Sequence, residues 1–138
     1  MVGVLAVALA LVFWRGYWFP KYPFAMAGCE AAYSFVRHHR GERVLAGDVG
    51  AVLLGGKPVM VSDPYAYSQL VRHGGWSDQD LQNKLGSGYF DLVLMSDQSG
   101  KRAERWTEPV RRALAEHYRP VQRFYCTGVA AAYEPGGN

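Results

Sequence analysis

Six consecutive residues, Phe90 to Met95 (FDLVLM), constrain the fold more than any other stretch of the chain. The run is almost continuously apolar, whereas a strand with one solvent-facing side alternates apolar and polar residues. Continuous apolar character is typical of a strand that is buried on both faces, as in a parallel sheet. The sequence therefore predicts an internal strand here, at the centre of a small sheet.

Shorter apolar runs alternate with helical patterns along the rest of the chain. The expected strands are 43–46, 58–61 and 90–95, followed by 121–125 and 129–133, which form an antiparallel hairpin around Gly128. The expected helices are 27–39, 48–54 and 64–73, with two more that begin at the capping residues Ser77 and Thr107. In the helix at 64–73 we expect Tyr67, Leu70 and Val71 to face inward. The fold class predicted is α/β, with a small, mostly parallel sheet, flanking helices and a C-terminal antiparallel hairpin.

The first residues differ in composition from the rest. Val2 to Trp14 carries no charge, and Arg15 and the aromatic residues 17–19 follow. Membrane–water interfaces select such aromatic and cationic side chains. We expect a transmembrane helix with an interfacial segment at 1–22, on a natural chain that starts further upstream, and a soluble α/β domain at 23–138. A cleaved signal peptide, which lacks its basic segment here, and a buried helix are the alternatives.

Charge, cysteine and histidine content exclude several functions. The net charge of +3 comes from 15 basic and 12 acidic residues that are intermixed, so no nucleic-acid partner is expected. Cys29 and Cys126 could pair in an oxidising compartment, but two separate small apolar side chains are the favoured interpretation. The four histidines show no metal-ligand spacing, and no metal site or cofactor is predicted.

Carboxylates and hydroxyls follow the expected strands. In open α/β sheets, ligands gather at the carboxyl ends of the strands, and the candidate binding residues at such ends are Asp48, Asp63, Ser96 and Asp97. Together they could bind a sugar, a metal or a phosphate. The alternative is structural, because Asp and Ser in such loops cap helices whatever the function. For Asp63 we expect a cap, since Pro64 suits the first helical position. No catalytic residue is predicted.

Three short motifs stand in a definite order: Gly56-Lys57-Pro58, Asp63-Pro64 and Phe90 to Val93 (FDLV). An apolar, aromatic segment precedes them, and a helix and hairpin between Glu108 and Tyr133 follow. In this order the chain resembles the C-terminal end of bacterial multi-pass membrane glycosyltransferases of the GT-C type, the superfamily of protein mannosyltransferases and aminoarabinose transferases. The resemblance covers nearly the whole chain.

The resemblance implies a fragment of an enzyme that takes a sugar from a polyprenyl-phosphate donor. The catalytic carboxylates of that family lie in an early loop that this chain lacks, so no catalytic residue is carried over. The soluble domain is expected outside the cytoplasm at a bacterial inner membrane, beside the bilayer and near the lipid-linked sugar or the acceptor, where it supports the substrate cavity. The alternatives are a stand-alone, membrane-anchored binding or interaction module and a hydrolase-like enzyme that uses Asp48 and Asp63.

Overall fold

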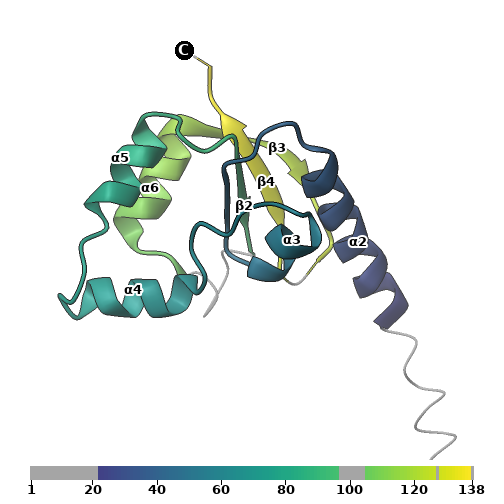
Figure 1. Ribbon diagram of the computed structural model, residues 1–138, viewed down its shortest axis with the longest axis horizontal. Coiled ribbons are helices and arrows are strands. Elements are labelled where there is room, and N and C mark those ends of the chain that lie inside the picture. The colour runs from purple at the N-terminus through teal and green to yellow at the C-terminus, as the bar shows by residue number, and fades with distance from the viewer. Residues whose placement is uncertain (1–21, 97–104, 127, 138) are drawn as a thin grey trace, which may run out of the picture.

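The computed structural model describes residues 22–96, 105–126 and 128–137, which form one four-stranded sheet with helices on both faces (Figure 1). The strands are β1 (Val44–Ala46), β2 (Leu92–Met95), β3 (Tyr118–Arg123) and β4 (Ala131–Pro135), in the spatial order β1-β2-β4-β3. Among these described strands, β1 and β2 alone pair in parallel; β4 pairs antiparallel with both β2 and β3.

The prediction of a mostly parallel sheet is therefore wrong, because the sheet is mixed. Residues 58–61, expected as a strand, lie outside the sheet, with Val59 36% and Met60 39% exposed. The place beside β2 is taken by β4 from the C-terminal hairpin. β2 is buried along its whole length, as its apolar run predicted, because it is internal and helices cover both faces. Its burial does not require parallel neighbours on both sides.

Alternate residues of β1 and β2 feed two separate clusters of apolar side chains. Val44, Ala46, Leu92 and Leu94 pack on one face with α2 (Tyr22–His38) and α3 (Val49–Leu54). Leu45, Val93 and Met95 pack on the other face with α5 (Gln79–Gly86) and α6 (Glu108–His117). The period of two that defines a strand thus divides the interior into two layers.

The expected helices are present, with differences in detail. α4 (Pro64–Arg72) buries Pro64 and Ser68, whereas Leu70 is 42% exposed, so the predicted inward face is wrong in part. The Ser68 hydroxyl donates a hydrogen bond to the Arg105 carbonyl at 2.7 Å, which fixes the α4 helix against the start of the segment before α6. A buried hydroxyl with a partner replaces the apolar contact that the helical pattern predicted.

In the described parts of the chain, no helix is both long and apolar enough to cross a membrane. The expected transmembrane segment, residues 1–21 in particular, lies outside the described residues. For the residues that are described, the prediction of a membrane-spanning, membrane-localised chain is wrong.

Cys29 and Cys126 form a disulfide across 97 residues of sequence, with their Cα atoms 4.7 Å apart. It joins α2 to the segment that follows β3. The preference for two separate cysteines is therefore wrong. The bond lies beside a close approach of two backbones, because Gly28 faces the main chain of Tyr125.

Candidate functional site

The carboxyl ends of β1 and β2 lie side by side, as predicted. The Gly47 N–H donates to the Leu94 carbonyl at 2.9 Å, so Asp48 and Ser96 leave the sheet at the same edge. Ser96 is 1% exposed. Asp97, the fourth candidate, lies outside the described residues. Asp63 follows no strand, because residues 58–61 are not one, and it lies with a different group of residues.

The Asp48 side chain caps the start of α3. Its Oδ1 accepts a hydrogen bond from the Gly50 N–H at 2.9 Å, which is the geometry of a helix cap. On its other side the chain returns closely: a Cβ on Gly128 would lie only 1.8 Å from Asp48 Oδ2. Asp48 thus lies against the chain between β3 and β4, and it lines neither of the two grooves described below.

Asp63 caps α4, as its position before Pro64 predicted. Its Oδ1 accepts from the N–H groups of Tyr65 and Ala66, both at 3.0 Å, and Pro64 occupies the first turn. Two backbone donors that have no partner within the helix are satisfied by one oxygen. The same carboxylate also lines a groove between α4 and α5.

Replacing Asp63 by alanine should lower the free energy of unfolding by about 0.5–2 kcal/mol, the usual cost of losing a helix cap. Asp63→Asn and Asp63→Ser should recover most of that loss, because both side chains still accept a hydrogen bond from the first turn. Urea denaturation followed by circular dichroism measures the difference. If Asp63→Asn were as unstable as Asp63→Ala, the capping role would be wrong.

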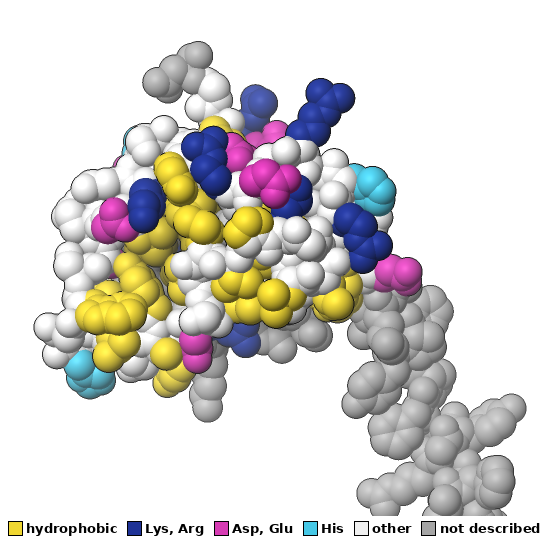
Figure 2. Space-filling view, viewed as in Figure 1, with side chains coloured by type: hydrophobic (Ala, Val, Ile, Leu, Met, Phe, Trp, Pro, Cys, Tyr) yellow, Lys and Arg dark blue, Asp and Glu magenta, His cyan; other side chains and the backbone are white. Residues whose placement is uncertain are grey.

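The groove between α4, α5 and the segment 60–63, called the α4–α5 groove below, has a volume of about 330 Å³. Val61, Leu81 and Phe90 are among the apolar side chains that line it. Figure 2 shows hydrophobic side chains gathered on this side of the molecule, over α4 and α5. Sequence reasoning did not identify this groove.

Two aromatic side chains form one wall of the α4–α5 groove. The Trp76 ring is 59% exposed and meets the Tyr67 ring edge-on, with 6.0 Å between centroids. The Trp76 backbone is held by a bond from its N–H to the Leu70 carbonyl at 3.3 Å, beside a second bond from Gly75 at 2.8 Å. Partial burial, with the Asp78 and Asp80 carboxylates nearby, raises the pKa of Tyr67, so its hydroxyl stays protonated.

The polar residues of the groove lie on α5 and at the start of α4. Asp80 Oδ2 accepts a hydrogen bond from Lys84 Nζ at 2.7 Å, and this bond raises the pKa of Lys84. With Asp63 the groove holds two carboxylates and one ammonium. An exposed aromatic wall, an apolar floor and a few acceptors are the usual composition of a small-molecule site.

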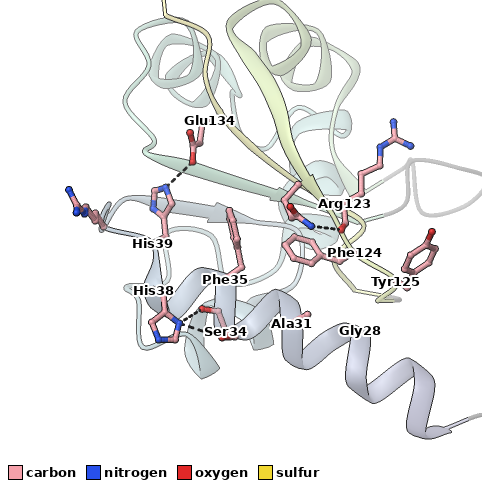
Figure 3. Close-up of a pocket in the computed structure, with 12 residues that line it drawn as sticks. Gly28, Ala31, Ser34, Phe35, His38, His39, Arg123, Phe124, Tyr125 and Glu134 are labelled. Atoms are coloured by element: carbon pink, nitrogen blue, oxygen red, sulfur yellow. Dashed lines mark hydrogen bonds and ion pairs between the residues drawn. The ribbon is translucent and has the colours of Figure 1, made fainter.

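A second groove runs between α2 and the β3–β4 hairpin, with a volume of about 820 Å³ (Figure 3). In it, Phe35 meets Phe124 edge-on at 5.6 Å, and His39 Nε2 lies 3.4 Å from Glu134 Oε1. The Gly41 N–H points at His39 Nδ1 at 3.1 Å, so in neutral His39 the proton sits on Nε2 and faces Glu134. His39 is thus a packed side chain that interacts through both ring nitrogens.

No three or more His, Cys, Asp or Glu side chains in the described ranges are placed to hold a metal ion together. Comparison with known protein families, with curated proteins and with solved structures found no match. The function must therefore be argued from the chemistry of the site and from the sequence resemblance.

Proposed function

We propose that this chain is a non-catalytic domain of a glycosyltransferase that takes its sugar from a polyprenyl-phosphate donor, and that it supports the substrate cavity of that enzyme. The observation that carries the proposal is the structural role of two candidate carboxylates. Asp48 and Asp63 each cap a helix, and of the two only Asp63 lines a groove. A hydrolase that used both would need them beside the same substrate.

Residues of the short motifs that carry the resemblance make structural contacts within the fold. This favours a domain with a structural role over a catalytic one. Lys57 is only 8% exposed and donates to the His39 carbonyl at 3.0 Å and to Glu42 Oε1 at 2.9 Å. Phe90 exchanges two hydrogen bonds with the buried Tyr118 hydroxyl, at 3.1 and 3.0 Å. These motif residues therefore stabilise the fold of the domain.

Asp91, the second residue of the FDLV motif, fastens β1 to β2. Its carboxylate pairs with the Arg43 guanidinium and accepts from the backbone N–H groups of Arg43 and Glu42, at 3.0 and 3.1 Å. The side-chain hydrogen bond from Arg43 is the largest cause that lowers the pKa of Asp91 to about 2. This carboxylate is therefore a fixed structural anion at neutral pH.

A stand-alone binding module is the second candidate, and the α4–α5 groove favours it. Such a module would need no catalytic residues and would use the groove for its own ligand. The two functions differ in the size of the natural protein and in whether it carries a catalytic loop.

The test measures sugar transfer. The purified 138-residue chain, incubated with radiolabelled decaprenyl-phosphate mannose and a peptide acceptor, should transfer or hydrolyse no sugar beyond a protein-free control. Turnover by this chain would contradict the proposal and favour the hydrolase. An immunoblot of the source cells with an antibody against residues 22–138 should detect a longer protein; a product of only 138 residues would favour the stand-alone module.

A further inference from the structure

Trp76 presents an exposed aromatic face on the wall of the α4–α5 groove. An indole that is 59% exposed contributes little to the core, yet its backbone is held by the turn after α4 and its ring contacts Tyr67. A flat, electron-rich surface fixed in this way is prepared to receive a ligand with little loss of side-chain freedom.

The polar groups of the α4–α5 groove narrow the class of ligand. Asp63 uses Oδ1 for capping, and within the described residues Oδ2 accepts no hydrogen bond. Asp80 lies four residues before Lys84 and is bonded to it. A purely apolar ligand would cover these groups without pairing them, which costs free energy. An anionic ligand would meet two carboxylates and one ammonium, a net negative set.

A pyranose ring can interact with both the aromatic surface and the polar side chains of the groove. Its axial C–H groups form an apolar face that stacks on an aromatic ring, and the hydroxyls around its edge donate to carboxylates. The groove volume of about 330 Å³ is at the lower end of the roughly 300–1,000 Å³ that is usual for small-molecule sites. It therefore suits a single sugar residue or a short oligosaccharide.

We propose that the α4–α5 groove binds a neutral pyranose, with the Trp76 indole as the stacking surface and the Asp63 and Asp80 carboxylates as acceptors for its hydroxyls. This rests on the proposed function, because it names the part of the domain that would contact the sugar of the donor or the acceptor. The Lys84 ammonium, held by Asp80, lines the same groove and has further N–H groups that could donate to a sugar oxygen.

The experiment is saturation-transfer NMR on the full chain with three probes: methyl α-D-mannopyranoside, methyl β-D-glucopyranoside and methyl α-D-galactopyranoside. At least one should show transfer to its ring protons. Trp76→Ala should weaken that binding by about tenfold or more, as expected from losing a stacked aromatic contact, and Trp76→Phe should lose less. Asp80→Asn should weaken it without changing the melting temperature by more than about 2 °C.

Tyr125→Ala is the matched control, because Tyr125 is an aromatic side chain that is 94% exposed and lines the other groove. It should leave binding unchanged. Absence of transfer from all three probes, or a signal that Tyr125→Ala removes and Trp76→Ala does not, would overturn the assignment. So would a concentration-dependent dimer that Trp76→Ala abolishes, since a second copy would then cover the groove. None of these outcomes depends on turnover, so the sugar site and the proposed function fail separately.

Discussion

Reducing the Cys29–Cys126 disulfide should lower the melting temperature of the protein by more than about 10 °C. The bond closes a loop of 97 residues, and cross-linking a loop of this length removes chain entropy from the unfolded state worth roughly 4–5 kcal/mol. For a domain of about 100 residues, each kcal/mol shifts the melting temperature by roughly 4–8 °C. Thermal unfolding with and without dithiothreitol, followed by circular dichroism, measures the shift.

The double variant Cys29→Ser/Cys126→Ser is the control for this effect. It should melt near the temperature of the reduced protein and should not respond to dithiothreitol. Mass spectrometry after alkylation establishes that the thiols are paired before reduction and free afterwards. An unchanged melting temperature with both thiols alkylated would contradict the stabilising role of the bond. Disulfides persist in oxidising environments and are lost in reducing ones. The protein should therefore be purified without reductant.

Gly28→Ala should lower the free energy of unfolding by about 1–3 kcal/mol, the range for inserting atoms into a packed contact. A Cβ at this position would lie 2.2 Å from the Tyr125 carbonyl oxygen and 2.8 Å from its carbonyl carbon. Both are main-chain atoms, so relief requires α2 to move away from the chain after β3. The disulfide at the next residue resists that movement. Guanidinium denaturation measures the loss.

Gly86→Ala is the matched control for this substitution. Gly86 ends α5, and the nearest atom to an added Cβ is His117 Nε2 at 3.7 Å, an ordinary contact. Alanine favours the helix over glycine by up to about 1 kcal/mol. Gly86→Ala should therefore be neutral or stabilising. Equal stability losses for the two variants would show that the close approach at Gly28 is not the cause.

The parts of the fold that sequence predicted correctly are those whose chemistry is local. The Asp63-Pro64 pair starts a helix through contacts within one turn, and the apolar run at β2 reports its own burial. The hairpin was also predicted, although its strands shift by a few residues from the expected ranges. Each of these depends on neighbours in sequence.

The features that sequence missed depend on residues far apart in the chain. Residues 58–61 have the composition of a strand, but β4 occupies the position next to β2 and leaves them outside. The disulfide requires α2 to lie against the hairpin, which no local pattern encodes. Trp76 lies between α4 and α5, and its ring contacts Tyr67, nine residues earlier in the chain. The step Gly75-Trp76-Ser77 was the one available signal, because glycines before an aromatic residue allow a turn that presents it.

The position of β4 inside the sheet has a consequence for synthesis on the ribosome. β2 can pair with three residues of β1 as soon as both have emerged, but its other edge stays open until the chain has been made through residue 133. An apolar strand with unpaired backbone groups is a site for association with other chains. The nascent chain therefore depends on protection of Leu92 to Met95 until β4 has been made.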